Sequence, residues 1–380
     1  MKTFLQPRAS MRNCTKFKLR KGQSKLRKDL LLNNMPNSRR CRRARLEEYL
    51  IATVSMAILV FACTSTVKGQ DPVSKAIESR TPVPVVIWHE TVDVQQLNLI
   101  YGAGGKEDAP NPNAKYKFRK EDESGSNPKF DVEDDSGVHW RVKLGPEPRA
   151  ETAATRLLFA AGYFVDEDYY LEDLLVEGLP KLHKGQSFVS DDGIVHGARL
   201  ERRTKEIKKL GTWEWFKNPF VGSKELNGLR VMMALINNWD LKTVNNSIYQ
   251  MEDQTVYAVT DVGATFGKTG NTAVRSKSRL KDYEDSKFIQ RITRDEVDFV
   301  LHSRPLFITA VDFPNYHERT AMQAITKHIP RADAKWLGQR LSQLSAEQIR
   351  DCFRAGGYTQ DEVEGYSRVV QNRIAELNAL

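Results

Sequence analysis

The chain has 380 residues and a formal net charge of +9 at neutral pH, from 58 Lys and Arg against 49 Asp and Glu. Residues 1–48 hold 15 of the basic and 3 of the acidic residues, so the rest of the chain has 43 and 46 and is nearly neutral. A near-neutral main part lacks the basic surface typical of nucleic-acid-binding proteins, so we expect no nucleic-acid partner. Only Cys352 follows Cys63, which excludes an intramolecular disulfide in that part.

The first predicted element is the uncharged 19-residue run Tyr49–Val67, which follows the basic tail of residues 1–48. Five arginines stand just before the run: Arg39, Arg40, Arg42, Arg43 and Arg45. An apolar run close to the ~20 residues that span a bilayer, with positive charge on its N-terminal side, is typical of a signal peptide or signal anchor. We therefore expect residues 49–69 to direct export and the rest of the protein to be extracytoplasmic, either secreted, periplasmic or membrane-anchored.

The sequence leaves the fate of this segment open. Cleavage before Gln70 would release the protein, and lipid attachment at Cys63 would anchor it. An uncleaved segment would hold the protein in the membrane through residues 49–67. Met35 is an alternative start that would leave a basic leader of ordinary length. Residues 70–94 contain three prolines and are interpreted as a linker.

The next region contains three alternating runs that predict strands: Tyr116–Glu121, Lys129–Asp134 and Val138–Leu144. The turn Ser124–Pro128 joins the first two runs and contains Gly125 and Ser126. A small, glycine-containing turn lets backbone N–H groups approach phosphate oxygens, and Lys129 adds positive charge beside it. We predict a phosphate-binding loop at Gly125, Ser126 and Lys129, with the glycine-rich stretch Tyr101–Lys106 as a rival.

Lys143 lies on the third of these strands, and the helix pattern Arg149–Ala161 follows it. Glu151 is in the first turn of that helix. A strand lysine paired with a helix glutamate is the ion pair that positions the nucleotide phosphates in kinases. We therefore predict a Lys143–Glu151 pair, with Glu147 as a competing partner. The alternative is an exposed strand lysine and a carboxylate that complements the helix dipole.

The remaining patterns predict a mixed middle region and a helical end. Two more strands are expected at Tyr169–Val176 and Gly193–Leu200, followed by a charged, solvated connection from Arg199 to Lys209. The sequence from Lys287 onward predicts helices, and three of its segments are amphipathic: Asp333–Leu344, Ala346–Ala355 and Gln360–Leu377.

Asp240 is expected on a loop, because the helix pattern Arg230–Ile236 ends shortly before it. Two short strands, Ser247–Met251 and Thr255–Thr260, then form a predicted hairpin. Asp261-Val262-Gly263 follows the hairpin directly. The order is therefore helix, loop, hairpin and an acidic turn.

Polar groups in this order suit the transfer of a phosphoryl group to a hydroxyl. Asp240 would orient or deprotonate the attacking hydroxyl, and Lys242 can reach the transferring phosphate. Asn245 and Asp261 would be ligands of the Mg²⁺ or Mn²⁺ ions that bridge the phosphates of ATP.

These motifs resemble those of the atypical, protein-kinase-like superfamily. The stretch Ser124–Lys129 followed by Lys143 is similar to the nucleotide-binding half of HipA-type kinases. Asp240 through Asn245 is similar to the catalytic loop of phosphatidylinositol kinases, and Asp261 through Gly267 resembles the metal-binding segment of those kinases and of secretory-pathway kinases. The resemblance covers residues 95–270. Trp239 and Lys242 depart from it, since relatives usually have Arg or Gly at the first position and, in two branches, His at the second.

We therefore expect an α+β, bilobal protein-kinase-like fold. Residues 95–200 would be a β-rich, nucleotide-binding N-terminal lobe, and residues 201–380 a mostly helical, catalytic C-terminal lobe. The expected function is an ATP- and metal-dependent phosphotransferase that acts on a hydroxyl of a protein, lipid or sugar. The alternative is a non-catalytic exported binding or envelope protein, because ATP is scarce outside a bacterial membrane.

A fusion of residues 1–90 to a reporter that is active only after export tests the predicted targeting segment. We expect an active reporter, because Tyr49–Val67 is apolar and the arginines before it retain the N-terminus in the cytoplasm. Replacing Leu50, Ile58 and Leu59 by Asp in the same fusion should abolish that activity. A reporter that works only in the cytoplasm would contradict export.

Overall fold

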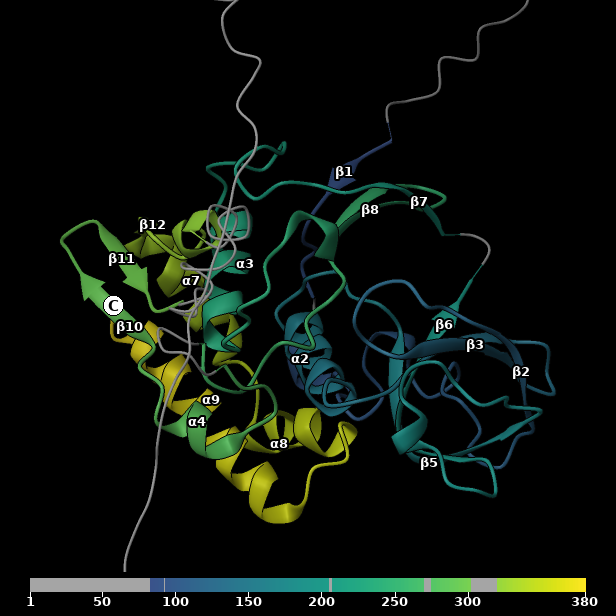
Figure 1. Ribbon diagram of the computed structural model, residues 1–380. Helices are drawn as coiled ribbons and strands as arrows, with labels where there is room; N and C mark the ends of the chain where they lie inside the picture. Colours follow the sequence, from purple (N-terminus) through teal and green to yellow (C-terminus); the bar gives the residue numbers. More distant parts are fainter. Residues whose placement is uncertain (1–82, 92, 205–206, 270–274, 302–319) are drawn as a thin grey trace, which may run out of the picture. The chain divides into compact units, whose positions relative to one another are not determined.

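The computed structural model describes residues 83–91, 93–204, 207–269, 275–301 and 320–380 (Figure 1). All of them belong to one compact unit, which begins at Ser79. The expected basic tail and the expected targeting segment Tyr49–Val67 lie outside the described residues. Among the described residues, no helix is both long enough and apolar enough to cross a membrane.

Five strands of the N-terminal part close into a barrel in the order β2-β3-β4-β6-β5. Their bounds are Tyr116–Glu121 (β2), Lys129–Glu133 (β3), His139–Lys143 (β4), Asp168–Glu177 (β5) and Ile194–Arg203 (β6). Neighbouring strands are antiparallel except β2 and β5, whose parallel pairing closes the barrel. Alternate residues point inward and form an apolar core that includes Phe130, Val132, Trp140, Val142 and Leu200. The residues between them face outward, and several of them are charged.

The expected strands are present, but β6 is longer than the sequence pattern indicated. It continues through Leu200 to Arg203, and the side chain of Arg199 is only 2% exposed. The expectation of a solvated connection that begins at Arg199 is therefore wrong. β4 and β5 both pair with this part of β6. Its charged residues are therefore part of the sheet and not of a loop.

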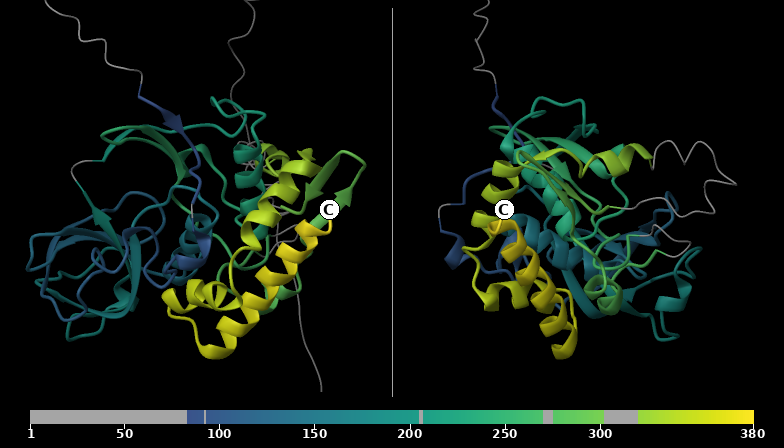
Figure 2. Two further views of the ribbon diagram at one scale, coloured as in Figure 1. Left: turned by 180° about the vertical axis from the view of Figure 1, so that it is seen from behind. Right: turned by 90° about the vertical axis from the view of Figure 1, so that its left-hand side faces the viewer.

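Helix α2 (Pro148–Ala160) lies between the barrel and the C-terminal helices (Figures 1 and 2). It packs against β5, β6 and α8 (Ala346–Ala355). Four buried alanines, at positions 150, 153, 154 and 160, let these neighbours approach closely. Gly162 has a φ of 96° and follows the helix, and a Cβ there would lie 2.5 Å from the carbonyl oxygen of His89.

The second part contains a four-stranded sheet in the order β1-β9-β8-β7. Its strand β1 comes from the segment before the barrel. The bounds of its strands are Val85–Val86 (β1), Lys208–Gly211 (β7), Asn246–Gln250 (β8) and Thr255–Val259 (β9). Helix α3 (Lys224–Leu235) precedes β8 and begins at Ser223, whose hydroxyl accepts a hydrogen bond from Leu226 N. Asn237 has a φ of 54°, a conformation that asparagine tolerates, and it turns the chain from α3 into the loop of Asp240.

The C-terminal helices α7 (Arg331–Leu341), α8 and α9 (Gln360–Asn378) lie close to the expected positions. Capping boxes fix the starts of two of them, with Ser345 and Gln348 at α8 and Thr359 and Glu362 at α9. The expectation of helix from Lys287 onward is wrong for the first part of that region. A small sheet, β10-β11-β12, stands there instead, because Val297 and Phe299 alternate with polar residues and point into the core. Its strands are Ile289–Ile292, Glu296–Phe299 and Ile329–Pro330.

Five further short elements lie in the described part of the chain. They are the helix α4 (Leu280–Glu284) and four 3-10 helices, η1 (Val94–Gln96), η2 (Gly102–Gly104), η3 (Gln186–Phe188) and η4 (Thr243–Asn245).

Phe353→Ala should lower the free energy of unfolding by about 3–5 kcal/mol. Phe353 is fully buried in the aromatic core and stacks on Tyr366 with ring centroids 5.1 Å apart. Phe216→Ala is the matched control, since Phe216 is 55% exposed and should tolerate the change. Urea denaturation of both variants measures the difference. Equal losses would show that the aromatic cluster is not a main source of stability.

Candidate active site

A cavity of about 1010 Å³ lies between the barrel, α2 and the β8–β9 hairpin. It is lined by the residues that the sequence singled out: Gly125, Ser126, Lys129, Lys143, Glu151, Asp240, Lys242, Asn245 and Asp261. Residues more than 130 positions apart in the chain are therefore brought to one place. Their catalytic and binding roles remain predictions.

Lys143 is the centre of the charged groups in this cavity. Its Nζ lies 2.8 Å from Glu151 Oε2, 2.7 Å from Glu147 Oε2 and 3.3 Å from Asp261 Oδ1. The sequence left Glu147 and Glu151 as competing partners, and the structure has both. Burial by itself lowers the pKa of Lys143, but the three carboxylates outweigh it and hold the pKa above its usual range.

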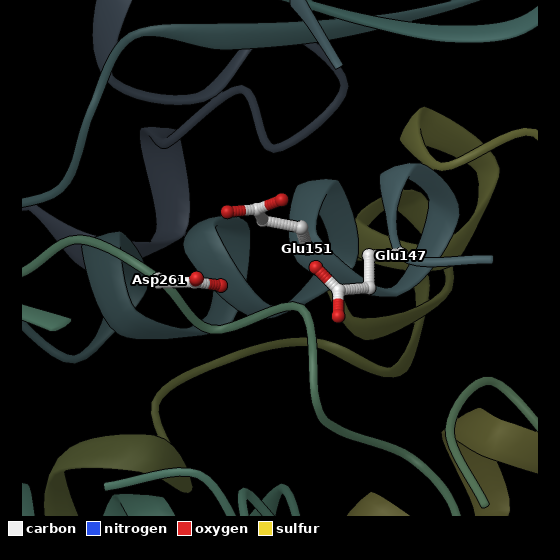
Figure 3. Close-up of side chains that lie close together, drawn as sticks. All are labelled: Glu147, Glu151 and Asp261. Atoms are coloured by element: carbon white, nitrogen blue, oxygen red, sulfur yellow. The ribbon is translucent and has the colours of Figure 1, made fainter. Parts of the chain in front are cut away.

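The carboxylates that contact Lys143 lie close together, as Figure 3 shows for Glu147, Glu151 and Asp261. One oxygen from each of Glu147, Glu151 and Asp261 lies within 4.8 Å of the others. Burial raises the pKa of Glu151 to about 7, against the attraction of Arg199 and Lys143. Burial also raises the pKa of Asp261, but Lys143 outweighs it and leaves the pKa below its usual range. The cluster has the oxygen donors that a hard divalent cation prefers.

Strand register places three cations in one row across the outer face of the barrel. Lys143 on β4 is directly opposite Lys129 on β3 and Arg199 on β6. All three line the cavity. We call Lys129, Lys143 and Arg199 the cationic row. Arg199 was missed from the sequence because its strand was ended too early, although its place between the apolar residues Ala198 and Leu200 was a usable signal.

Buried ion pairs hold Arg199 in place. Its Nε lies 2.7 Å from Asp168 Oδ2, and its Nη1 lies 3.2 Å from Glu201 Oε2. Asp168 also accepts a hydrogen bond of 2.7 Å from Arg156 on α2. Arg199 Nη2 is buried and lies 3.9 Å from Asp166 Oδ2, so carboxylates surround the whole guanidinium group.

The loop after α3 supplies the second group of predicted residues. Asn245 Nδ2 donates a hydrogen bond of 2.6 Å to the Asp240 carbonyl, which fixes the loop and leaves the amide oxygen of Asn245 for another partner. Lys242 Nζ lies 3.1 Å from Asp240 Oδ1. The loop therefore presents one carboxylate, one amide oxygen and one ammonium to the cavity.

The predicted phosphate loop also lies at the cavity. Gly125 has a φ of 72°, which favours glycine, and Asn127 donates a hydrogen bond of 2.6 Å to Glu147. Lys184 stabilises the loop, because its Nζ donates hydrogen bonds to the carbonyls of Glu123 and Gly125 at 2.6 and 2.7 Å. The rival stretch Tyr101–Lys106 contributes only Ala103 to the cavity lining.

Arg275 and Lys277, from a segment after Asp261, also line the cavity. Trp239 Nε1 donates to the carbonyl of Ser276 at 3.1 Å, and the guanidinium of Arg275 lies 4.1 Å from the Trp239 ring centroid. Lys277 pairs with Glu147. Trp239, which departs from the kinase motif that the sequence resembles, therefore anchors this segment.

The sequence matches no protein-family model and no curated protein. The structure is similar to the proinflammatory kinase CtkA of Helicobacter pylori, with 10% identity, 70% of this chain and 95% of that chain covered, and a TM-score of 0.41. It is also similar to the Golgi casein kinase, with 10% identity, 71% and 73% coverage and a TM-score of 0.32. A second structure of that kinase, with Mn and ADP bound, gives 10% identity, 71% and 74% coverage and a TM-score of 0.31.

The described part of the chain has the α+β architecture that the sequence predicted. A β-rich N-terminal region precedes a mostly helical C-terminal region. The strand lysine, the following helix glutamate, the loop with Asp240 and Asn245, and Asp261 after the hairpin occur in the expected order around one cavity.

Lys143→Met should lower the free energy of unfolding at pH 7 by about 3 kcal/mol, because it leaves buried carboxylates without their cation. The pKa of Glu151 is raised above its unfolded value of 4.5, so ionised Glu151 costs stability as the pH rises above that value. The loss should therefore shrink at pH 5, where Glu151 is protonated in the folded protein.

Urea denaturation at both pH values measures this difference, and Lys117→Met on the exposed face of β2 is the control. An equal loss at pH 5 and pH 7 would attribute the effect to lost packing instead of lost charge.

Proposed function

We propose that this protein is a phosphotransferase that uses ATP and a divalent metal ion to phosphorylate a hydroxyl group. The observation that supports the proposal is the convergence of Lys143, Glu151, Asp240, Asn245 and Asp261 on one cavity. These residues supply the cation, metal ligands and carboxylate that phosphoryl transfer needs.

The nucleotide phosphates would lie along the cationic row. Lys143 is held in place by Glu151 at 2.8 Å and so presents a fixed positive charge. Lys129 and Arg199 extend this charge to either side on the neighbouring strands. Backbone groups at Gly125 and Ser126 would cover the phosphates from the adjacent turn.

Asp261 and the amide oxygen of Asn245 would hold Mg²⁺ or Mn²⁺, and the ion would neutralise charge on the transferring phosphoryl group. The residues present fit such an ion, because carboxylate and amide oxygens are the ligands of hard cations. Glu147, which the sequence left as a partner of Lys143, contributes a further carboxylate to the same cluster.

Asp240 would accept the proton of the attacking hydroxyl. Its carboxylate lies on a loop that Asn245 fixes, so it can orient the acceptor without holding the metal. Lys242, 3.1 Å from Asp240, would stabilise the negative charge of the transferring group. The acceptor is proposed only as a hydroxyl of a protein, lipid or sugar.

The proposed location is extracytoplasmic, and it rests on the targeting segment expected at Tyr49–Val67. A protein in that location meets little ATP unless a secretory lumen supplies it. A non-catalytic, nucleotide-binding protein with the same fold is therefore the second candidate.

Asp240→Asn should reduce phosphoryl transfer at least ~100-fold and leave nucleotide affinity nearly unchanged, because Asp240 acts on the acceptor. Asp261→Asn should instead weaken the binding of ATP with Mg²⁺ or Mn²⁺, because it removes a charged metal ligand. Thermal stabilisation measures binding, and ATP at 100 times its Kd should add about 2.7 kcal/mol to the parent.

Asp253→Asn, at an exposed position in the β8–β9 turn, is the matched control and should change neither quantity. A parent that ATP and metal stabilise without any turnover would favour the binding protein. A parent that ATP does not stabilise would refute the nucleotide site.

A further inference from the structure

Arg373 on α9 is buried, and its side chain reaches the end of α3. Its Nη1 donates hydrogen bonds to the carbonyls of Ala234 and Leu235 at 3.2 and 2.7 Å. A guanidinium group at this place bonds to the last carbonyls of the helix and complements the helix dipole. The rings of Tyr283 and Phe288 hold the group, with centroids 4.3 and 5.2 Å from Arg373 Cζ.

The same guanidinium group fixes the side chain of Asn237, the residue that turns the chain from α3 into the loop of Asp240. Arg373 Nη1 donates to Asn237 Oδ1 at 2.8 Å, and its Nη2 donates to Ser286 Oγ at 2.7 Å. Ser286 Oγ also accepts a hydrogen bond from Asn237 Nδ2 at 2.8 Å, which closes a ring. Both ends of the Asn237 amide are therefore held, and the amide rotates only if these bonds break.

Asn237 connects the two chain segments that carry the proposed catalytic and metal-binding carboxylates. It lies three positions before Asp240, and its Nδ2 donates to the carbonyl of Gly267 at 2.8 Å, in the segment that follows Asp261. Two backbone hydrogen bonds join the same segments: Phe266 N to the carbonyl of Ile236 at 2.9 Å, and Trp239 N to the carbonyl of Ala264 at 3.3 Å. The start of the Asp240 loop is thus fixed against the segment after Asp261.

The nucleotide side of the cavity has separate supports. Asp261 contacts Lys143 at 3.3 Å. The β8–β9 hairpin lies between Asn245 and Asp261 in the chain, and its ladder holds these two proposed metal ligands together. Asp240 precedes that hairpin, so its position depends on its bond to Asn245 and on the turn at Asn237.

We propose that Arg373 is a positioning residue for the phosphoryl transfer, because through Asn237 it fixes the loop that presents Asp240 to the acceptor hydroxyl. The inference rests on the proposed function. Arg373 does not line the cavity, so it acts on the reaction only through the loop. Helix α9 therefore sets the turnover rate, while other residues hold the nucleotide.

Turnover and ATP affinity, measured on the full chain with Mg²⁺, separate these roles. Water takes the place of the acceptor: its oxygen bonds to the terminal phosphorus, the bond from that phosphorus to ADP breaks, and its proton goes to Asp240. Release of inorganic phosphate measures kcat, and isothermal titration measures the Kd of ATP. Arg373→Met should lower kcat at least about tenfold and leave the Kd within about twofold of the parent, because small displacements of a reacting group are costly.

A double-mutant cycle tests the route through Asn237. Asn237→Gly removes the amide, and glycine tolerates the φ of 54° at this position. This variant should lower kcat as Arg373→Met does. The two changes together should cause little further loss, because both remove the same contact.

Two further variants control for the fold. Arg373→Lys keeps the positive charge at the end of α3 but lacks the planar fork that reaches Leu235, Asn237 and Ser286 together. It should fold if the Met variant does not, and its kcat should still fall with ATP affinity unchanged. Arg340→Met is the matched control, since Arg340 on α7 is also buried, donates to the carbonyl of Thr91 at 3.0 Å and should change neither quantity.

Hydrogen exchange gives a measurement that needs no turnover. In Arg373→Met and in Arg373→Lys, the amides of Trp239 and Phe266 should exchange faster than in the parent, because their bonds join the loop to the segment after Asp261. The amides of β4, which has a partner strand on both sides, should keep the parent rate.

Unchanged kcat in both Arg373 variants would overturn the inference and leave the proposed function intact. A loss of ATP affinity as large as the loss of kcat would also overturn it, because Arg373 would then support the nucleotide site or the whole fold. Additive losses in the double variant, or unchanged exchange at Trp239 and Phe266, would exclude a route through Asn237. A parent that binds ATP and releases no phosphate would favour the binding protein and end this inference with it.

Discussion

The buried ammonium group of Lys143 is the interaction on which the arrangement of the cavity depends. Its three carboxylate partners come from the start of α2 and from the turn after β9. A buried charge without a partner is far more costly than one with partners, so β4, α2 and the Asp261 turn have to keep their relative positions. The same contacts would hold the nucleotide lysine next to the proposed metal ligands.

Packing around α2 supports this arrangement from the other side. The helix is buried along almost its whole length, and its alanines allow β5, β6 and α8 to approach closely. Arg156 on α2 and Arg199 on β6 share the buried carboxylate of Asp168. Movement of α2 away from the barrel would therefore break apolar contacts and a buried ionic network together. The apolar contacts and the ionic network therefore both keep Glu151 beside Lys143.

Each of the barrel strands β3, β4 and β6 has an apolar side that faces the core and a charged side that faces the cavity. Phe130, Val142 and Leu200 point into the apolar core, while Lys129, Lys143 and Arg199 lie between such residues and face the cavity. Because side chains alternate along a strand, closing the barrel around its apolar residues turns the charged set outward as a group. The ordered row of charge in the cavity is thus a consequence of the same register that forms the core.

The sequence by itself determined the local elements and the types of residue in the site. Alternation and helical periodicity predicted β2 to β5, α2, α3 and the C-terminal helices, and the Asp240, Asn245 and Asp261 spacing predicted a loop and hairpin order. Tertiary structure decided the full length of β6 and the sheet at Val297, because pairing with neighbouring strands overrides local charge and polarity. It also decided that Glu147 and Glu151 both contact Lys143, and that Arg199 lies beside it. Those contacts depend on strand register and helix position, and a single sequence does not specify either.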